Sequence, residues 1–339
     1  MEVFVTGGTG YIGSHTVVEL MQAGHRVVIA DNLCHSDRNV LEGIQAITGQ
    51  MPEFHPVDCR DRDALDRVFE MHPHLDAVIH FAALKAVEES ERLPLEYYEN
   101  NLGSLINLLK VMRKHQVKKI VFSSSCTVYG EPEHSPVTEQ TPVQPATSPY
   151  GATKQMCEQI LRDAVRADQT LSATALRYFN PIGAHESGLI GEKPQGVPPN
   201  LLPYVTETAA GIRKELCIFG NDYPTPDGTC IRDFIHVSDL AKAHVCALRQ
   251  MQNAPAAWRI YNIGTGRGVS VKELVDAFVR ATGVDVPFRY APRRTGDIEQ
   301  VWADSSLAER ELGWKSEKTL EETLLSAWRW QQHITNQGK

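Results

Sequence analysis

A tyrosine and a lysine four residues apart are the first pair of side chains in this sequence that could perform acid–base chemistry. Tyr150 and Lys154 stand in the run Tyr-Gly-Ala-Thr-Lys, directly after a proline-rich stretch at residues 142–149. On a helix, residues at i and i+4 project from one face, so the ammonium group could stabilise a phenolate and lower the tyrosine pKa toward neutrality. Such a tyrosine is suited to proton transfer. The alternative interpretation is an ordinary helix surface, because this spacing is common.

A run of three serines, residues 123–125, follows an apolar segment that reads as a buried strand. The carboxyl ends of strands in open α/β sheets face the ligand crevice, so a serine there could hydrogen-bond a reacting hydroxyl group. The alternative is that these serines are simply the polar end of a strand and have no functional role. With Tyr150 and Lys154, Ser125 completes the predicted catalytic set.

Glycines follow the first apolar segment in the run Thr-Gly-Gly-Thr-Gly-Tyr-Ile-Gly, residues 6–13. Gly7, Gly10 and Gly13 would let a strand-to-helix turn tighten and let the backbone approach a pyrophosphate, whose charge lies at the helix N-terminus. The spacing is GxxGxxG rather than GxGxxG, and any tight turn favours glycine. The position at the first predicted strand–helix junction nevertheless favours dinucleotide binding.

Acidic residues follow the second and third apolar segments. Asp31 lies about 20 residues after the glycine turn, where a carboxylate can bind ribose hydroxyls and repel a 2′-phosphate. This predicts NAD rather than NADP, although Arg38 leaves NADP open, and Asp31 with Asn32 could simply cap a loop. Asp58 could similarly face the adenine, or cap a helix before Arg60.

The elements that must position these residues alternate regularly in the first half of the chain. Short continuous apolar runs, typical of strands buried on both faces, alternate with helix-length amphipathic segments. The predicted strands are residues 3–6, 26–30, 53–57, 77–81, 119–123 and 171–176, and the predicted helices are residues 12–23, 64–71, 94–115 and 150–167. This alternation predicts an α/β fold with a doubly wound parallel (Rossmann) sheet.

The composition changes after about residue 180, where prolines and glycines interrupt the alternation. The 339 residues also exceed the usual size of one hydrophobic core. We therefore expect an NAD-binding domain at residues 1–180, a strand near residues 260–264 that returns to it, and a second, smaller α/β lobe at residues 181–339 that binds mainly the substrate.

Charge and cysteine content exclude several classes of protein. The 34 basic and 42 acidic residues give a formal net charge of -8, which disfavours nucleic acid as a partner. The seven cysteines show no CxxC spacing and the histidines no HExxH motif, so we expect no metal and no disulfide framework. The start of the chain lacks a signal-peptide pattern, and no apolar run approaches about 18 residues. We expect a cytoplasmic protein with no membrane partner.

Motifs along nearly the whole chain resemble the extended short-chain dehydrogenase/reductase family, and within it the UDP-galactose 4-epimerase branch. The stretches that carry this resemblance are residues 6–15, 31–33, 80–87, 94–98, 123–130, 176–181, 219–225, 232–233, 261–262 and 291–294. The resemblance implies an NAD-dependent isomerase of galactose and nucleotide-sugar metabolism. It would interconvert UDP-galactose and UDP-glucose at sugar C4 through a 4-keto intermediate, with NAD bound throughout.

The resemblance also implies roles for individual residues. Tyr150 would be the acid/base at the sugar 4-hydroxyl, Lys154 would hold the nicotinamide ribose, and Ser125 would assist the proton transfer. The implied cofactor-binding residues are Gly7, Gly10, Tyr11, Ile12, Gly13, Asp31, Asn32, Asp58, Cys59, Phe81, Ala82, Ala83, Lys85, Asn100, Ser123, Tyr150, Lys154 and Tyr178. The implied substrate-binding residues are Ser125, Tyr150, Asn180, Asn200, Leu201, Cys217, Ile218, Phe219, Arg232, Arg294, Asp297 and Val301. Two arginines suit a diphosphate, because their planar groups bind its oxygens in pairs.

The resemblance extends to assembly and to substrate breadth. It implies a homodimer joined through residues 94–115 and 150–167. In the resembling family, the residue four positions after Asp297 lies beside the sugar 2-substituent, and here it is the small residue Val301. This implies that UDP-N-acetylglucosamine and UDP-N-acetylgalactosamine are also interconverted. Alternatively, Val301 is a strand residue that packs beneath Trp302.

Three other functions fit parts of the pattern. A nucleotide-sugar 4,6-dehydratase carries an Asp-Glu pair where this sequence has Cys126 and Thr127, so dehydration is disfavoured. A simple ketone reductase would release its dinucleotide in each cycle and would not need a second lobe with diphosphate-binding arginines. A redox-sensing regulator that binds a dinucleotide without catalysis would not need Tyr150 and Lys154.

Overall fold

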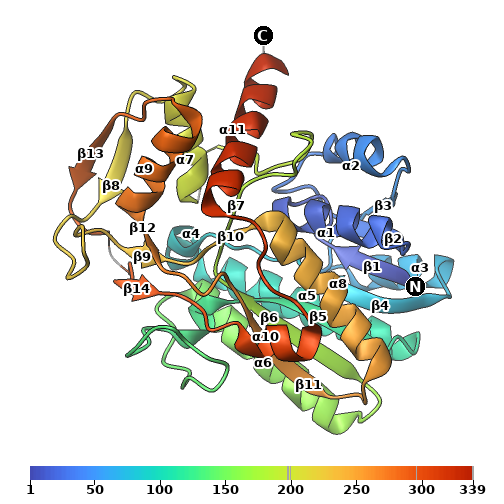
Figure 1. Cartoon of the computed structure of the whole chain (residues 1–339). Helices are drawn as coiled ribbons and strands as arrows, with labels where there is room; N and C mark the ends of the chain where they lie inside the picture. Colours follow the sequence, from blue (N-terminus) through green and yellow to red (C-terminus); the bar gives the residue numbers. More distant parts are fainter. Residues whose placement is uncertain (197, 199, 295, 338–339) are drawn as a thin grey trace.

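The computed structural model describes residues 1–196, 198, 200–294 and 296–337. Within them, the chain forms a large domain around a parallel sheet and a smaller lobe beside it (Figure 1). The sheet has the order β3-β2-β1-β4-β5-β6-β11. Its strands are β1 (Glu2–Thr6), β2 (Arg26–Asp31), β3 (Glu53–Pro56), β4 (Leu75–His80), β5 (Lys119–Ser125), β6 (Ser172–Tyr178) and β11 (Trp258–Ile263). This is the Rossmann strand order with one strand added, so the predicted α/β fold is confirmed.

Helices cover both faces of this sheet (Figure 1). One face packs against α1 (Tyr11–Gln22), α2 (Val40–Thr48), α8 (Val237–Asn253) and α10 (Ser306–Leu312). The other face packs against α3 (Arg62–Met71), α5 (Pro94–Lys114) and α6 (Pro149–Ala167). The short helix α4 (Val87–Arg92) and the 3₁₀ helix η1 (Cys126–Tyr129) lie in the connections around β5.

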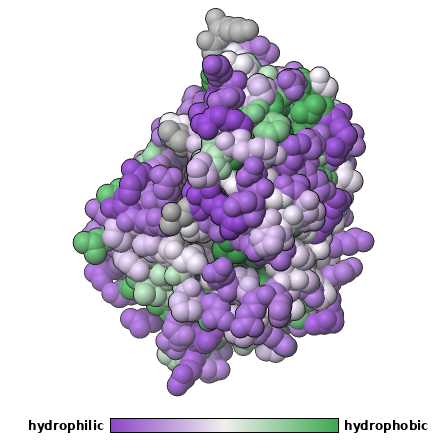
Figure 2. All heavy atoms as spheres, turned by 90° about the vertical axis from the view of Figure 1, so that its left-hand side faces the viewer, coloured by the Kyte–Doolittle hydropathy of each residue, from purple (hydrophilic) through white to green (hydrophobic). Residues whose placement is uncertain are grey.

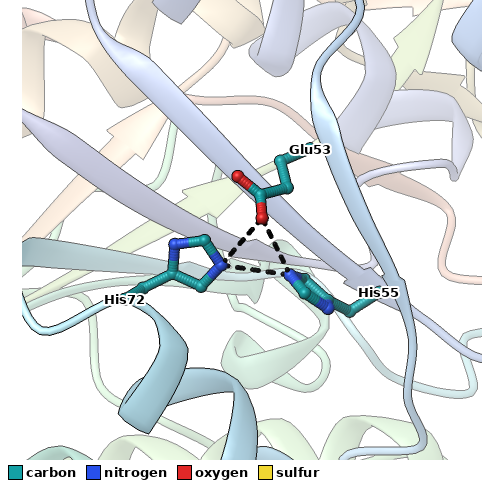
Figure 3. Close-up of side chains that lie close together, drawn as sticks. All are labelled: Glu53, His55 and His72. Carbon is teal, nitrogen blue, oxygen red and sulfur yellow. Dashed lines mark hydrogen bonds and ion pairs between the residues drawn. The ribbon is translucent and has the colours of Figure 1, made fainter.

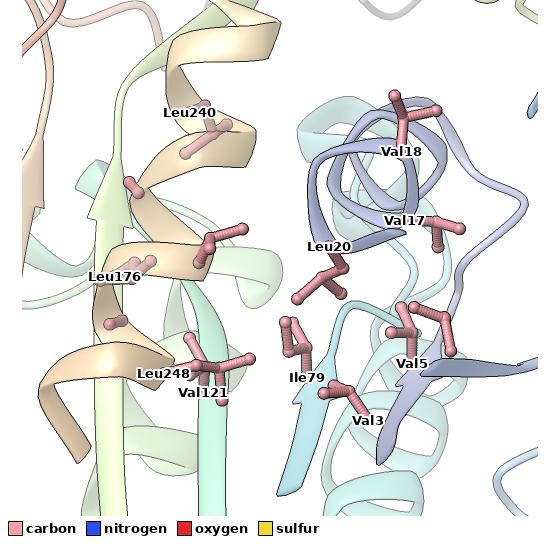
Figure 4. Packing of buried hydrophobic residues seen from close by; sticks show 14 of the residues in the cluster. Val3, Val5, Val17, Val18, Leu20, Ile79, Val121, Leu176, Leu240 and Leu248 are labelled. Carbon is pink, nitrogen blue, oxygen red and sulfur yellow. The ribbon is translucent and has the colours of Figure 1, made fainter. Parts of the chain in front are cut away.

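Alternate residues of each strand enter the two cores. Val3 and Val5 of β1 pack with Leu20 of α1 and with Ile79 of β4 in one cluster (Figure 4). Phe4, between them, belongs to the cluster on the opposite face. Because both faces are buried, the strands are apolar at successive positions, which is the pattern that made them recognisable in the sequence.

The smaller lobe has a hydrophobic core of its own. Its elements are β7 (Asn180–Ile182), α7 (Leu201–Ala209), β8 (Leu216–Phe219), β9 (Ile231–Arg232), β10 (Phe234–His236), β12 (Val269–Ser270), α9 (Val271–Thr282), β13 (Phe288–Ala291), β14 (Gln300–Val301) and α11 (Leu320–Gln337). Val205, Leu216, Phe278 and Leu324 pack together where α7, α9 and α11 meet. Three small sheets, β10-β7, β12-β9-β14 and β13-β8, complete this lobe.

The chain beyond residue 180 crosses between the lobe and the sheet. β11 pairs with β6 at the residues where a returning strand was expected. Two helices that the sequence analysis did not place also return: Leu240 and Leu248 of α8 and Ala308 of α10 lie in the core of the sheet (Figure 4). Only part of residues 181–339 therefore belongs to the smaller lobe.

The surface on the side of the smaller lobe is mostly hydrophilic. Figure 2 shows that, outside the grey atoms, hydrophilic residues cover most of this face and hydrophobic residues are scattered among them. Among the described residues, no helix is both long enough and apolar enough to cross a membrane.

Candidate active site

A cavity of about 840 Å³ opens at the carboxyl ends of the sheet strands. It is lined by the turn after β1, by Asp31 at the end of β2, by Asp58 shortly after β3 and by Phe81 after β4. The strand order reverses between β1 and β4, so the helices that follow them leave on opposite faces of the sheet and open a crevice there. The fold therefore puts the glycine turn and the ends of four strands around one space.

The first turn of α6 carries Tyr150 into this cavity. Ser148 caps the helix by accepting a hydrogen bond from the backbone N–H of Gly151, at 3.2 Å, and Pro149 occupies the first helical position. Lys154 lies one turn further along the same face, and its Nζ is 5.7 Å from the centre of the Tyr150 ring. Ser125, at the end of β5, hydrogen-bonds Tyr150. The three predicted catalytic residues thus lie together in the cavity.

Burial governs the protonation of this group. It raises the pKa of Tyr150 well above its usual value, and the hydrogen bond with Ser125 offsets only part of this effect. Burial disfavours the charged form of Lys154 as well, and therefore lowers its pKa to about 8. In the chain alone, burial therefore outweighs any lowering of the Tyr150 pKa, and the effect of Lys154 on it stays a prediction. Lys154 is itself desolvated, and its Nζ donates a hydrogen bond to the Ser123 carbonyl at 2.6 Å.

A buried ion pair lies directly behind the catalytic residues. Arg177 of β6 donates from Nε and Nη2 to the two carboxylate oxygens of Glu158, at 2.8 and 2.5 Å. Ser124 of β5 donates to the same carboxylate at 2.6 Å. Successive strand residues point to opposite faces, so Ser124 reaches this pair while Ser123 and Ser125 line the cavity. The sequence analysis missed Glu158 and Arg177, because nothing in their spacing marks them as partners.

The turn after β1 is so tightly packed that two of its glycines leave no room for a side chain. A Cβ added to Gly13 would lie 2.1 Å from the Gly7 carbonyl oxygen, and one added to Gly7 would lie 2.8 Å from the Ala82 backbone nitrogen. Gly10 caps α1 without a side-chain hydrogen bond. The first turn of α1 lines the cavity, so its backbone N–H groups and the positive end of the helix dipole are available to an anion.

The far end of the cavity carries the two predicted ribose- or adenine-facing carboxylates. Asp31 accepts hydrogen bonds from the backbone N–H groups of Leu33, at 2.9 Å, and Thr9, at 3.3 Å. Asp58 pairs with Arg60 at 2.8 Å, and the hydrogen bonds from Arg60 lower the pKa of Asp58 to about 2. Both carboxylates are thus held in fixed orientations beside the cavity.

Arg38, which kept NADP open in the sequence analysis, is directed elsewhere. Its guanidinium lies over the Phe54 ring, 5.3 Å from the ring centre. Arg38 is not among the described residues that line the cavity, whereas Asp31 is. The surroundings of the ribose position therefore favour a 2′-hydroxyl over a 2′-phosphate.

The cavity gathers every residue predicted to bind the dinucleotide, together with four predicted to bind substrate, one of which, Tyr150, belongs to both sets. The cofactor set on its wall is Gly7, Gly10, Tyr11, Ile12, Gly13, Asp31, Asn32, Asp58, Cys59, Phe81, Ala82, Ala83, Lys85, Asn100, Ser123, Tyr150, Lys154 and Tyr178. From the substrate set, Ser125, Asn180 and Asn200 lie beside Tyr150 on the same wall. These residues come from segments spread over the first 200 positions.

A second group of predicted substrate residues lies together on the smaller lobe. Asp297 lies 2.7 Å from Arg294 and 3.9 Å from Arg232, measured between oxygen and nitrogen. The Arg294 guanidinium lies 5.6 Å from the ring centre of Phe219, whose side chain is exposed. These residues are not part of the wall of the 840 Å³ cavity. The structure nevertheless brings the two arginines, an acid and an aromatic ring together, and their role in substrate binding stays a prediction.

Of the remaining predicted substrate residues, two are buried and two are partly buried. Leu201 begins α7 and packs against the core of the lobe, and Ile218 of β8 lies within that core. Cys217 of β8 is partly exposed. Val301 of β14 is only 4% exposed and packs in a cluster with Phe179. Phe179 lines the cavity and Val301 does not, so Val301 lies one side chain behind the wall.

Sequence reasoning missed the part of the wall that comes from the smaller lobe. Glu192 and Trp330 line the cavity, and the Trp330 indole N–H donates to the Glu192 carbonyl at 2.8 Å. Glu192 also lies 3.6 Å from Lys85 and accepts a hydrogen bond from Asn200 at 2.5 Å. No motif marks these positions, because their role depends on the docking of α11 and the segment before α7.

Comparisons with known proteins agree with this geometry. Residues 3–264 match the model of the NAD dependent epimerase/dehydratase family. The UDP-glucose 4-epimerase of Bacillus subtilis (strain 168) is 53% identical over 336 residues, which cover 99% of this chain and 98% of that protein.

Solved structures of similar proteins extend over the same length. A UDP-glucose 4-epimerase from Stenotrophomonas maltophila, with bound NAD and formylated UDP-arabinopyranose, has a TM-score of 0.96 and 50% identity and covers 99% of both chains. The UDP-Glc/GlcNAc 4-epimerase from Campylobacter jejuni has a TM-score of 0.84 and 37% identity, covering 98% of this chain and 99% of that one.

Gly13→Ala tests the pyrophosphate cradle. The added methyl group would collide with the Gly7 carbonyl and open the turn, and such overpacking costs roughly 1–3 kcal/mol, which is about 5- to 150-fold in affinity for added NAD. Equilibrium titration of NAD-stripped protein measures this. Gly103→Ala, on α5 with open space around it, is the matched control and should bind NAD normally. Equal affinities of the two variants would contradict the assignment of the cradle.

Proposed function

The chain belongs to the NAD dependent epimerase/dehydratase family, and we propose that it interconverts UDP-galactose and UDP-glucose at sugar C4. It is an NAD-dependent epimerase, which is an isomerase. The proposal rests on one observation: the glycine turn at residues 6–13 and Tyr150 line the same cavity. In that cavity a sugar hydroxyl can lie between the acid/base and the cofactor.

In the proposed reaction, Tyr150 moves the proton of the sugar 4-hydroxyl. It accepts this proton while the C4–H bond breaks and its electron pair leaves, which oxidises C4 to a ketone. NAD, when bound, would supply the hydride acceptor and donor for C4, and rotation of the 4-keto sugar in the cavity would present its opposite face. Tyr150 then gives back the proton, so no net oxidation occurs. Tyr150 must be a phenolate when it accepts this proton. Burial keeps the phenol protonated in the chain alone, so the positive charges of Lys154 and of bound NAD would have to lower its pKa.

Two neighbours adjust Tyr150 in this scheme. Ser125 hydrogen-bonds Tyr150 and assists the transfer of the hydroxyl proton. Lys154 holds the nicotinamide ribose, and its charge favours the phenolate form of Tyr150 that accepts the proton. The hydrogen bond from Lys154 to the Ser123 carbonyl fixes the ammonium group within the cavity wall.

We assign the UDP moiety to the arginine group of the smaller lobe. Arg232 and Arg294 provide two guanidinium groups for the diphosphate oxygens. Asp297 keeps them close together, and the exposed Phe219 ring offers a flat apolar surface beside Arg294. This division gives the nucleotide several polar anchors and leaves the sugar few, as rotation of the 4-keto sugar requires.

We further propose a homodimer that forms through α5 and α6, in the cytoplasm. Leu95 and Ile106 of α5 and Met156 of α6 are exposed by 76%, 37% and 44%, on two helices that pack against each other. Apolar side chains on adjacent exposed helices support a self-complementary contact. All seven cysteines are free thiols in the structure, which fits a reducing compartment.

Turnover without added cofactor tests the activity and its mechanism together. Purified protein mixed with UDP-galactose in D2O should yield UDP-glucose with no deuterium at C4, because the hydride leaves and returns within one closed complex. NMR of the product measures both. Absence of UDP-glucose, even with NAD added, would reject the epimerase assignment, and deuterium at C4 would reject the internal hydride return.

Tyr150→Phe tests the acid/base. The variant removes one oxygen, so it should still bind NAD and UDP while kcat falls on the order of 10²–10⁴-fold. Tyr290→Phe, at an exposed position of β13, is the control and should leave kcat unchanged. A near-normal kcat for Tyr150→Phe would reassign proton transfer, with Ser125 as the next candidate.

The proposal extends to the N-acetylated sugars. Val301 packs against the cavity-lining Phe179, so the small valine supports a pocket with room for a 2-acetamido group. The similar Campylobacter jejuni protein is described as a UDP-Glc/GlcNAc 4-epimerase. We propose that this chain also interconverts UDP-N-acetylglucosamine and UDP-N-acetylgalactosamine.

Val301→Tyr tests this breadth. The larger ring should push Phe179 toward the sugar and lower kcat/KM for the N-acetylated pair about 10- to 200-fold more than for the unacetylated pair. Val301→Ile keeps a similar volume and should retain both activities. Thermal unfolding of each variant detects any general loss of packing. Negligible wild-type activity on the N-acetylated pair would overturn the proposal.

A further inference from the structure

Two histidines and a glutamate converge at the edge of the sheet, outside the catalytic cavity. Glu53 and His55 lie two residues apart on β3 and therefore on one face of the strand, and His72 caps the C-terminus of α3 (Figure 3). His72 Nε2 lies 3.1 Å from both His55 Nε2 and Glu53 Oε1, and the third distance, from His55 Nε2 to Glu53 Oε1, is 3.5 Å. Three atoms that carry lone pairs thus face one another.

Protons alone cannot make all three of these contacts favourable. If one imidazole donates from Nε2 to the other, the acceptor nitrogen presents its lone pair to the Glu53 oxygen. If both imidazoles donate to Glu53, two N–H groups face each other across 3.1 Å. A neutral imidazole has one donor and one acceptor nitrogen, so one of the three contacts stays repulsive in each arrangement. A cation at the centre would make all three attractive.

The spacing of the three atoms matches a tetrahedral metal site. With Zn–N and Zn–O bonds of about 2.0–2.1 Å, neighbouring ligands of a tetrahedral Zn²⁺ lie about 3.3–3.4 Å apart. The observed separations are 3.1, 3.1 and 3.5 Å. The Glu53 side chain is 42% exposed, so the site opens to solvent, where a water molecule can complete the coordination.

The surroundings provide the outer partner that a histidine ligand needs. Glu2 Oε1 lies 3.4 Å from His72 Nδ1, is buried and lacks a hydrogen-bond partner. A carboxylate at this nitrogen fixes the proton on Nδ1 and leaves Nε2 free to bind a metal. Arg26 lies 3.2 Å from both Glu2 and Glu53, where it holds the second oxygen of Glu53. With neutral imidazoles, two carboxylates and one guanidinium leave a net negative site.

We propose that Glu53, His55 and His72 bind one Zn²⁺ ion, with Glu2 as the outer partner of His72. The sequence analysis predicted no metal, because two ligands at i and i+2 with a third 17 residues later match no motif with metal-ligand spacing. The ion would join the edge strand β3 to the end of α3 and, through Glu2, to β1. Neither Glu2 nor any of the three ligands is among the described residues that line the cavity, so the ion would stabilise the fold and take no part in the reaction.

Metal titration of the full-length, NAD-loaded protein tests the site. ZnCl₂ added to metal-stripped protein should bind with a stoichiometry of about one per chain in competition with a chromophoric chelator. CoCl₂ should give the visible bands of a tetrahedral ion without a thiolate charge-transfer band. Both metals should raise the unfolding temperature, because they bind the folded chain and not the unfolded one.

Single substitutions locate the metal. His55→Gln should weaken Zn²⁺ binding by more than the roughly 10–100-fold that loss of an outer partner costs, and Glu2→Gln should fall within that range. Glu53→Gln, on the partly exposed strand, keeps the test available if His72→Gln does not fold. His74→Gln, at an exposed position two residues away, is the matched control and should bind like wild type. Epimerase activity should stay within about twofold in all of them.

Two results would overturn the proposal. One is wild-type protein that binds no Zn²⁺ tightly enough to compete with the chelator. The other is binding that His55→Gln and Glu53→Gln leave unchanged, which would mean that the metal is held elsewhere, for example by the exposed thiol of Cys34. Neither result depends on the epimerase activity.

Discussion

The ion pair between Glu158 and Arg177 is the interaction on which the geometry of the catalytic residues depends. It joins α6 to β6, and the hydrogen bond from Ser124 adds β5. Tyr150 and Lys154 lie two turns and one turn before Glu158, so their distance from β5 is set where this carboxylate is held. Breaking a buried pair by removing one partner costs about 3–5 kcal/mol, because a charge is left without compensation. The positions of the catalytic residues therefore depend on a buried ion pair that tolerates little displacement of its two side chains.

Two carboxylates near the catalytic cavity are paired with arginines. Glu158 is neutralised by Arg177, and Asp58 by Arg60. Lys154 has no such partner at hydrogen-bond distance and instead donates to a backbone carbonyl. Lys154 and the positive end of α1 both line the cavity, where they suit the anionic pyrophosphate of a dinucleotide.

Asp233 holds separate segments of the smaller lobe together, as Glu158 holds α6, β5 and β6 together in the large domain. Its buried carboxylate accepts hydrogen bonds from Thr265, Gly266 and Ala303, and its carbonyl accepts one from the backbone N–H of Asn180 at 3.0 Å. Four segments far apart in the sequence thus meet beside Arg232. This explains how a lobe of short strands and loops can hold its arginines at a definite distance from the sheet.

The sequence by itself determined the features that depend on local spacing. The continuous apolar strands, the glycine turn at residues 6–13 and the one-turn spacing of Tyr150 and Lys154 follow from backbone periodicity, so the Rossmann sheet and its cofactor wall were predictable. Family resemblance added the expected substrate residues, of which Arg232, Arg294 and Asp297 lie together in the structure.

Only the tertiary structure decided which distant segments meet and how far water is excluded from them. The raised pKa of Tyr150 arises from burial, which no spacing reveals. The contribution of Glu192 and Trp330 to the cavity, the pairing of Glu158 with Arg177 and the meeting of His55 with His72 each need segments that fold against one another. Desolvation and long-range contact are properties of the packed chain, because they depend on neighbours that sequence order does not specify.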